Sequence, residues 1–345
     1  MPMSFDQPQF DRQLFDGFWQ LLCHRTELPA QGDFLRFDTP GGEVVVFNDD
    51  GELVAFDNRC PHRGARIYQG DHGNQAATCG YHGWTFRKGH LIIPERESFV
   101  GCNIETATFR TLPVDWCGDF LFLGVAPRQP LYAQLGEVAT LLENISFNIA
   151  GRHDFSRYDF ECSWPLAVEN ALEPYHISMV HPATLGTLGL EAGENVFDGK
   201  NSVWYAPVGN DKVRKKLATL KRFFQLDFQY EGYMSIYLYP FTMLSSTFGY
   251  SYSLQHFLPH PTNPDRTSFT SRLLSTPASS PAAAAVVKPF LDSTAAVNRK
   301  VFDEDHAICR TMPRDSWTAE PLRFPSTSEA KIVHFRESCR AVLAK

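Results

Sequence analysis

The sequence contains few cysteines, no excess of basic residues and no long apolar run. Eight cysteines in 345 residues are too few for a disulfide framework. The 32 Lys and Arg residues are outnumbered by 39 Asp and Glu residues, and the net charge of -7 gives no electrostatic footprint for nucleic acid. No apolar segment approaches the roughly 20 residues that a bilayer crossing needs, and the first residues lack the pattern of a signal peptide. We therefore expect a cytoplasmic protein with reduced cysteines that binds neither nucleic acid nor membranes.

Aromatic residues, in contrast, are abundant. The chain has 28 Phe, 12 Tyr and 6 Trp, and hydrophobic residues make up 43% of it. This composition is typical of a folded globular protein with a large core. At roughly 150 residues per domain, the length predicts two domains.

The first part of the chain has the pattern of short antiparallel strands. Runs rich in Val, Leu and Phe alternate with turns from Phe18 onward, and Asp49-Asp50-Gly51 predicts a hairpin. The pattern continues to an apolar strand over residues 119–125 and stops where Pro127 and Pro130 follow. We predict a small antiparallel β domain over residues 15–127.

The second part, residues 128–345, mixes helices and strands. Its pattern predicts aromatic strands over residues 226–274 and helices near 282–312 and 328–344, the first of them with Pro281 in its first turn. The pattern therefore predicts the α+β class, with a curved antiparallel sheet around a helix, an arrangement similar to a helix-grip fold. Residues 1–14 are expected to pack with this second domain.

Two Cys and His pairs form the strongest motif. Cys60 and His62 make a C-x-H pair, and after sixteen intervening residues Cys79 and His82 make a C-x-x-H pair. Two thiolates and two imidazoles are able to hold a tetrahedral zinc ion. They are also the ligands of a Rieske 2Fe-2S cluster, in which two Cys hold one iron and two His hold the other.

The residues around these pairs favour the cluster. Gly64, Gly80 and Gly83 allow the two loops to approach closely, and Trp84 is placed to shield a cluster from water. The segments Cys60-Pro61-His62-Arg63-Gly64 and Cys79-Gly80-Tyr81-His82-Gly83-Trp84 resemble the signature of the Rieske family.

A second constellation follows in the other domain. Glu173, His176 and His181 form an E-x-x-H-x-x-x-x-H motif, and two imidazoles plus a carboxylate are the ligands of a mononuclear Fe(II) with open positions. Residues 176 and 181 are five apart, about 140° out of phase on a helix, so a regular helix cannot direct both at one metal. Pro174 predicts a break in the helix there, with His181 at or beyond a helical end. The alternative is a solvated acidic helix face that also includes Glu169.

Together, the two constellations resemble the large subunit of Rieske non-haem iron oxygenases over nearly the whole chain. The resemblance implies that His176 and His181 bind the mononuclear iron. It also implies that Glu173 bridges His82 of one subunit and His176 of its neighbour by hydrogen bonds. Most members of the family carry Asp at this position, so the longer Glu side chain is a departure from the pattern.

The third iron ligand is implied to be an acidic residue on a late helix. Within Val301–Cys309 the family pattern aligns best with Asp305, followed by Asp303 and then Glu304. The alternative for each of the three is a solvated position at the start of a helix near Lys300.

The resemblance implies an enzyme that uses dioxygen to hydroxylate, dihydroxylate or oxidatively demethylate a small organic substrate, with an aromatic substrate expected. Electrons from NADH or NADPH would come through a separate flavin or iron-sulfur reductase, or a ferredoxin, because the chain lacks a G-x-G-x-x-G motif opening a βαβ unit. A ring of three chains is implied. The competing function is a Rieske protein that transfers electrons or senses redox state without catalysis.

Two segments are expected to build the substrate pocket. Some of the aromatic residues over 223–257 should line a mostly apolar pocket above the iron, while most belong to the core. Residues 212–222 predict an amphipathic surface helix that covers this pocket; its basic residues could also guide an acidic reductase or a carboxylate substrate. The remaining cysteines, which are Cys23, Cys102, Cys117, Cys162, Cys309 and Cys339, are expected to be buried thiols.

Overall fold

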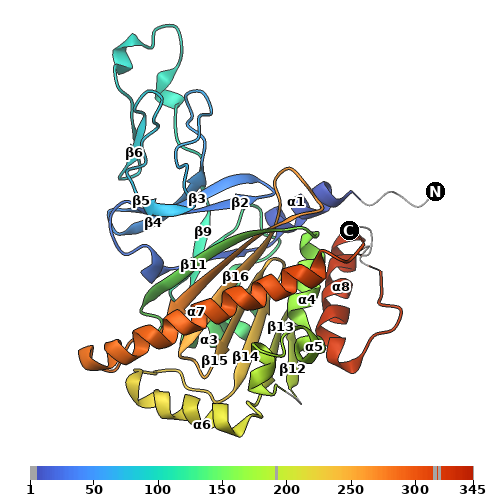
Figure 1. Ribbon diagram of the computed structural model, residues 1–345. Helices are drawn as coiled ribbons and strands as arrows, with labels where there is room; N and C mark the ends of the chain where they lie inside the picture. Colours follow the sequence, from blue (N-terminus) through green and yellow to red (C-terminus); the bar gives the residue numbers. More distant parts are fainter. Residues whose placement is uncertain (1–5, 191–192, 314–316, 318–319, 345) are drawn as a thin grey trace, which may run out of the picture.

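The computed structural model describes residues 6–190, 193–313, 317 and 320–344. A β-rich N-terminal unit stands on one side of a larger unit of helices and sheet (Figure 1). The predicted α+β class is confirmed. No helix within the described ranges is both long and apolar enough to span a membrane.

The N-terminal unit consists of short antiparallel strands: β1 (Gln20–His24), β2 (Asp33–Thr39), β3 (Gly42–Asp49), β4 (Glu52–Asp57), β5 (His72–Asn74), β6 (Thr85–Arg87), β7 (His90–Ile92), β8 (Thr111–Leu112), β9 (Val114–Cys117) and β10 (Phe120–Leu123). They form sheets of order β5-β2-β3-β4-β8, β1-β10-β9 and β6-β7. The predicted hairpin joins β3 to β4. Asp50 and Gly51 adopt left-handed backbone angles there, with φ of 61° and 97°, and the Asn48 side chain accepts a hydrogen bond from Gly51 N.

The second unit is built on one antiparallel sheet, whose strands are β11 (Gly151–Phe160), β12 (Glu194–Asp198), β13 (Asn201–Ala206), β14 (Tyr233–Leu238), β15 (Thr242–Thr247), β16 (Ser251–Pro259) and β17 (Thr267–Ser275). Their order is β11-β17-β16-β15-β14-β13-β12. The aromatic segment predicted to form strands is therefore β14 to β17.

The α-helices are α1 (Gln7–Gly17), α2 (Leu131–Leu135), α3 (Val138–Ser146), α4 (Trp164–Leu172), α5 (Ile177–Val180), α6 (Asp211–Leu220), α7 (Pro281–Cys309) and α8 (Ala330–Leu343). Short 3-10 turns complete the chain: η1 (Arg25–Glu27), η2 (Arg96–Ser98), η3 (Ile104–Thr106), η4 (Leu185–Leu188), η5 (Lys221–Phe223) and η6 (Thr327–Glu329). The two late helices predicted from the sequence are α7 and α8, and Pro281 lies in the first turn of α7 as expected.

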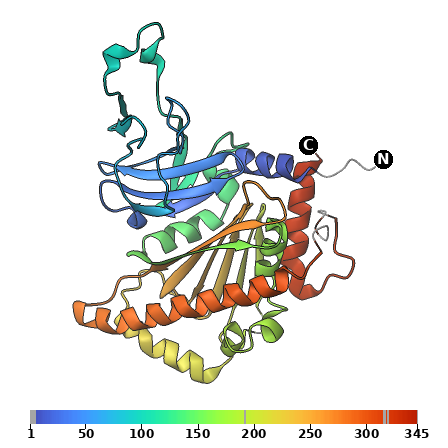
Figure 2. The same cartoon turned by 45° about the horizontal axis from the view of Figure 1, so that its top comes forward.

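The large sheet lies between two helical layers (Figure 2). The long helix α7 crosses one face, and α3 lies on the other face, between this sheet and the N-terminal unit. Side chains alternate along the strands accordingly. Met234, Ile236 and Leu254 pack in the same core cluster as α2 and α3. The odd-numbered positions beside them, such as Ser235 and Ser253, therefore face α7.

Charged and aromatic contacts hold the two units together. Arg157 of β11 forms ion pairs with Asp38 of β2 and with Asp71. Helix α1 packs on the second unit, since the Trp164 indole donates a 2.6 Å hydrogen bond to Asp11 and Phe10 joins the same core cluster. Residues 1–5 lie outside the described residues.

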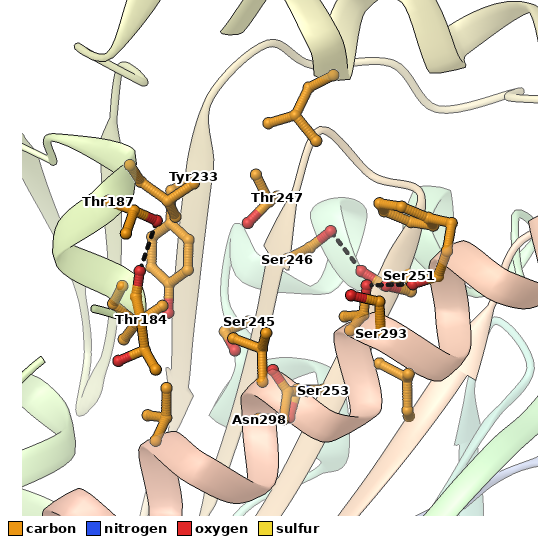
Figure 3. Close-up of a pocket in the computed structure, with 18 of the residues that line it drawn as sticks. Thr184, Thr187, Tyr233, Ser245, Ser246, Thr247, Ser251, Ser253, Ser293 and Asn298 are labelled. Carbon is orange, nitrogen blue, oxygen red and sulfur yellow. Dashed lines mark hydrogen bonds between the residues drawn. The ribbon is translucent and has the colours of Figure 1, made fainter. Parts of the chain in front are cut away.

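A cavity of about 270 Å³ lies between the sheet, α7 and α6 (Figure 3). Helix α6 is the amphipathic helix predicted over residues 212–222, and Val213 and Leu217 form part of the cavity wall. The prediction that this helix covers the pocket is confirmed.

Candidate metal centres

The two Cys and His pairs lie on matching loops of the N-terminal unit. Cys60 and His62 precede β5, and Cys79 and His82 precede β6. Each loop is closed by a backbone hydrogen bond: Gly64 N donates to Cys60 O at 2.8 Å, and Gly83 N donates to Cys79 O at 2.9 Å. Both glycines have left-handed φ angles, 76° and 74°, which a side chain would strain.

The donor groups of these loops converge. Cys60 and Cys79 are buried, and the rings of His62 and His82 lie 4.7 Å apart. Trp84 is buried and stacks on His62 with ring centroids 4.9 Å apart. The His62 Nδ1 atom is buried and has no hydrogen-bond partner among the described residues. An imidazole nitrogen in that state fits a metal ligand.

The spacing of the four donors fits a two-iron cluster better than a single ion. Among the described residues, the group of three or more donor atoms that lie within 4.8 Å of one another is that of His176, His181 and Asp305. No three of the donors of Cys60, His62, Cys79 and His82 lie that close together. The ligands of a tetrahedral zinc, at about 2.0–2.3 Å from the ion, would be mutually closer than this. This spacing fits the geometry of a binuclear cluster, in which the Cys pair and the His pair bind different irons.

The second site begins where α4 is interrupted. Helix α4 ends at Leu172, and Glu173 is extended with φ -112° and ψ 140° because Pro174 follows it. The single turn of α5 starts after His176 and ends before His181. The predicted break is confirmed, and it brings together two histidines that a continuous helix would separate.

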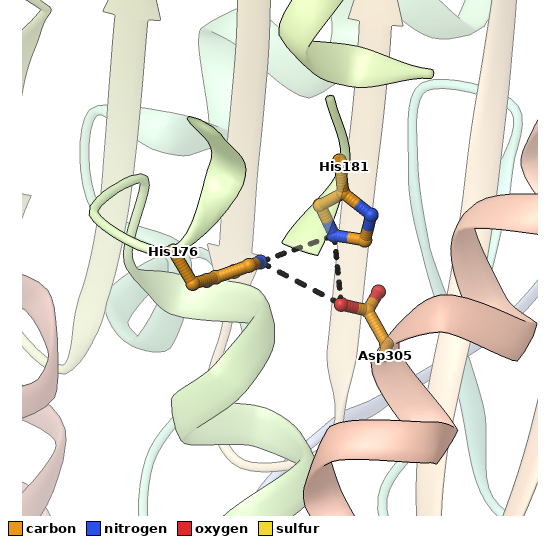
Figure 4. A group of neighbouring side chains, drawn as sticks. All are labelled: His176, His181 and Asp305. Atoms are coloured by element: carbon orange, nitrogen blue, oxygen red, sulfur yellow. Dashed lines mark hydrogen bonds and ion pairs between the residues drawn. The ribbon is translucent and has the colours of Figure 1, made fainter. Parts of the chain in front are cut away.

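His176, His181 and Asp305 meet at one point (Figure 4). The two Nε2 atoms are 3.2 Å apart, and Asp305 Oδ1 lies 2.9 Å from that of His181 and 3.6 Å from that of His176. His181 is fully buried. Two imidazoles and one carboxylate on one side of a metal leave coordination positions open for other ligands.

A second layer of acceptors orients the histidines. Glu173 accepts a 2.5 Å hydrogen bond from His176 Nδ1, and Glu304 lies 2.8 Å from His181 Nδ1. Thr184 donates to the same Glu304 oxygen at 2.7 Å, and Asn170 donates to Asp305 Oδ1 at 2.7 Å. Acceptors on Nδ1 leave each Nε2 free to bind a metal.

The acidic residues of α7 lie on different faces of the helix. The buried stripe of this helix includes Phe302 and Cys309, and Asp305 lies on the same face. Asp303, the second candidate, is exposed. The alternative of a solvated acidic helix around Glu169 is wrong, because Glu169 is buried and forms a two-point ion pair with Arg336.

One expectation about the cysteines is wrong. Cys102 is exposed, whereas Cys23, Cys117, Cys162, Cys309 and Cys339 are buried as expected. Cys102 lies between two short 3-10 turns of the N-terminal unit, and these turns bury none of their own residues.

Replacement of Glu304 by Gln should weaken the metal site without removing a ligand. Gln keeps the size of the side chain but loses the charge that favours the interaction with His181. We expect metal affinity to fall by about 10- to 100-fold. Competition with a fluorescent chelator measures this change, and Glu194→Gln, at an exposed strand position, is the matched control. Unchanged affinity in the Glu304 variant would contradict a supporting role.

Binding of Fe(II) to the metal-free site should release protons. Burial alone would lower the pKa of His176, but hydrogen bonds to Asp305 and Glu173 raise it to about 9. At pH 7 the metal-free His176 is thus protonated, and iron must displace that proton. Apparent affinity should rise about tenfold per pH unit for each displaced proton, up to the pKa of His176. Anaerobic calorimetry of chelator-treated protein over this range tests the expectation, and a pH-independent affinity would contradict it.

Comparison with known protein families identifies the two domains that carry these sites. The model of the Rieske [2Fe-2S] domain matches residues 18–98, and the model of the ring hydroxylating alpha subunit catalytic domain matches residues 148–345, more than half of the chain. The chain belongs to the ring-hydroxylating alpha-subunit family. One Rieske cluster and one mononuclear iron, the cofactors predicted from the sequence, are those of the two matched domains. The boundary predicted near residue 127 falls between the matched ranges.

Named relatives of this alpha subunit act on different compounds. Toluate 1,2-dioxygenase subunit alpha of Pseudomonas putida is 31% identical over 196 residues, which are 52% of this chain and 42% of the relative. The glycine betaine monooxygenase oxygenase subunit of Chromohalobacter salexigens is 27% identical over 184 residues, 51% of this chain and 41% of the relative. The chain thus spans less than half the length of these curated relatives.

Solved structures share the fold over almost the entire chain. The quaternary ammonium Rieske monooxygenase CntA superposes with a TM-score of 0.76 over 96% of this chain and 91% of its own, at 19% identity. Naphthalene 1,2-dioxygenase does so with a TM-score of 0.75 over 99% and 91%, at 18% identity. The predicted two-part architecture is therefore that of known oxygenases.

Proposed function

We propose that this alpha subunit is an oxygenase that hydroxylates, dihydroxylates or oxidatively demethylates a small organic substrate. The observation that carries the proposal is the meeting of His176, His181 and Asp305 beside a cavity. A site with three protein ligands leaves room for dioxygen and substrate, whereas a structural site would be closed. An electron carrier has no need of this second site.

The residues of the two sites would have different roles. Cys60, His62, Cys79 and His82 would hold the cluster, and His176, His181 and Asp305 would hold the mononuclear iron. When bound, the cluster supplies single electrons and the iron activates dioxygen. Glu173 and Glu304 keep the two iron-site histidines in the required tautomer and orientation. Val301 and Phe302 line the side of the site toward the cavity and exclude water.

Electron delivery would require a neighbouring chain. Within one chain, the loops that carry the Cys and His pairs project away from the large sheet and α7 (Figure 1). Tyr175 and Met179, which flank His176, are 68% and 83% exposed, and Tyr81, stacked on His82, is 58% exposed. We propose that these surfaces meet in a ring of three chains, so that His82 of one chain approaches Glu173 of the next.

Replacement of Met179 by Asp should dissociate the proposed ring into single chains. A charge at the centre of an apolar contact has to be desolvated on assembly, which disfavours association. Native mass spectrometry should show three chains for the unaltered protein and mainly single chains for the variant. Met312→Asp, at another exposed methionine, is the control. A variant that stays fully assembled would contradict the proposed interface.

The reductant would come from a separate protein. We propose a flavin or iron-sulfur reductase, with or without a ferredoxin, that takes electrons from NADH or NADPH in the cytoplasm. The two family models that match account for residues 18–98 and 148–345, and neither describes a nicotinamide-binding domain. Purified protein should therefore be reduced by NADH only after a reductase is added.

Isotopically labelled dioxygen tests the function directly. The iron-loaded protein, a general reductase and NADH are incubated with a panel of small aromatic and heterocyclic compounds. Transfer of labelled oxygen into a product, or release of formaldehyde from a methyl group, is expected. If the cluster cycles rapidly with reductase while no compound gains label or releases formaldehyde, the protein is an electron carrier and the proposal is wrong.

A further inference from the structure

The cavity of about 270 Å³ adjoins the candidate iron site. A second cavity of about 60 Å³ lies against His176, His181 and Asp305. The two cavities share five residues of their walls: Leu185, Tyr233, Gln255, Val301 and Phe302. A molecule seated in the larger space would therefore reach toward the iron site.

The floor of the larger cavity carries many hydroxyl and amide groups (Figure 3). They come from β15 and β16: Ser245, Ser246, Thr247, Ser251, Ser253 and Gln255. Helix α7 adds Ser293 and Asn298 from the opposite wall. None of the described residues in this wall is Asp, Glu, Lys or Arg.

Some of these polar groups lack a protein partner. The Ser235 hydroxyl, in the floor of the smaller cavity, is buried and forms no hydrogen bond with any described residue. The Gln255 amide donates to the Ser253 hydroxyl at 3.1 Å, which leaves its carbonyl oxygen to accept another bond. A buried hydroxyl without a partner is unfavourable, and a bound molecule with a polar group would satisfy it.

Charged groups near the cavity are turned away or already paired. The basic residues of α6, such as Lys212 and Lys216, are exposed, because the helix directs Val213 and Leu217 inward. Glu173 and Asp305, which line the smaller cavity, interact with His176 and His181. Glu304 interacts with His181 and Thr184. A substrate carboxylate or quaternary ammonium would lose its hydration here without gaining a protein countercharge.

We infer that the cavity takes an uncharged substrate with a mostly apolar skeleton and hydroxyl, carbonyl or amide groups that pair with Ser235, Gln255 and Asn298. The inference rests on the proposed function, since it names the substrate class of the same site. Leu185, Leu273 and Phe302 supply the apolar part of the wall. The basic residues of α6 would then serve no role in binding a carboxylate substrate.

Binding of probes that differ only in charge tests the inference. Naphthamide, naphthoate and naphthyl-trimethylammonium are titrated anaerobically into the iron-loaded protein, and the dissociation constants are measured by calorimetry. Naphthamide should bind at least about tenfold more tightly than either ion. Equal or tighter binding of an ion, or no binding of the amide, would overturn the inference.

A change of charge in the wall should reverse the preference. Asn298→Arg places a guanidinium opposite the floor and should improve naphthoate binding at least about tenfold, while naphthamide binding falls. Thr219→Arg, on the exposed side of α6, should change neither constant. Ser235→Ala should weaken naphthamide binding and leave the binding of naphthalene unchanged. An Asn298 variant that folds but binds naphthoate no better would overturn the placement of the substrate.

The binding test separates this inference from the proposed function. If naphthamide binds selectively but no compound of the neutral class gains labelled oxygen, the inference stands and the oxygenase function fails. If a carboxylate or ammonium compound is oxidised as efficiently as its neutral counterpart, the oxygenase function stands and the inference fails.

Discussion

Replacement of His176 by Ala should abolish substrate oxidation and leave the Rieske spectrum intact. His176 contributes one of three donor atoms, and with two left the site should lose its iron. The cluster loops belong to another sheet and share no residue with this site. We expect turnover to fall at least about 1,000-fold and the iron content to fall by one atom per chain.

The measurements for this variant are visible absorption, iron content and turnover with reductase. His260→Ala, in the loop after β16, is the control and should behave like the unaltered protein. Retained turnover in the His176 variant would refute the assignment of the mononuclear site, and loss of the cluster spectrum would show that the two sites are not independent.

Replacement of Glu173 by Gln should leave both metal centres bound but stop electron transfer from the cluster to the mononuclear iron. The two carboxylate oxygens of Glu173 accept hydrogen bonds from the backbone N and from Nδ1 of His176, and a Gln side chain can supply only one acceptor. The proposed link to His82 of the neighbouring chain also depends on this carboxylate. We expect turnover to fall by at least about 100-fold.

Rapid mixing gives the direct readout for Glu173. Reduced protein is mixed with dioxygen and an identified substrate, and reoxidation of the cluster is followed by absorption. The Gln variant should be reoxidised far more slowly, while Glu194→Gln should match the unaltered protein. Full turnover in the Glu173 variant would count against the bridge.

Local sequence signals were sufficient for much of the architecture. The loops around Cys60 and Cys79 could be predicted because their residues lie within a few positions of one another, and the glycines that close them are in the motif itself. The break after α4 could be predicted because Pro174 acts on its own neighbours. The hairpin at Asp49–Gly51 could be predicted for the same reason, because its turn residues are adjacent in the sequence.

The choice of Asp305 over Asp303 could have been made more sharply from helical phase. Phe302 and Cys309 lie on the buried stripe of α7. Around the helix, residue 305 is only about 60° from Phe302 and about 40° from Cys309, whereas residue 303 is about 100° or more from both. Glu304 is the least favoured ligand candidate in the sequence, with a solvated helix position as the alternative. Its role beside His181 depends on a contact between residues 123 positions apart, which no local pattern reveals.

The cavity wall is mostly apolar, as expected, but the hydroxyl groups that it also carries could not be predicted from the sequence. Most of the aromatic residues between 223 and 257 are expected in the core, and Tyr237 and Phe257 are there. Tyr233 is the one in β14 that lines the cavity. The serines between the rings face α7 instead, because the strand alternation and the position of α7 together decide which face is exposed to the cavity.

Metal and sulfide analysis of the purified chain tests the central claim most directly. An oxygenase with a Rieske cluster and a separate catalytic iron should hold about three irons and two acid-labile sulfides per chain. Two irons with two sulfides would contradict the catalytic site and leave only an electron carrier. Zinc without sulfide would contradict both sites.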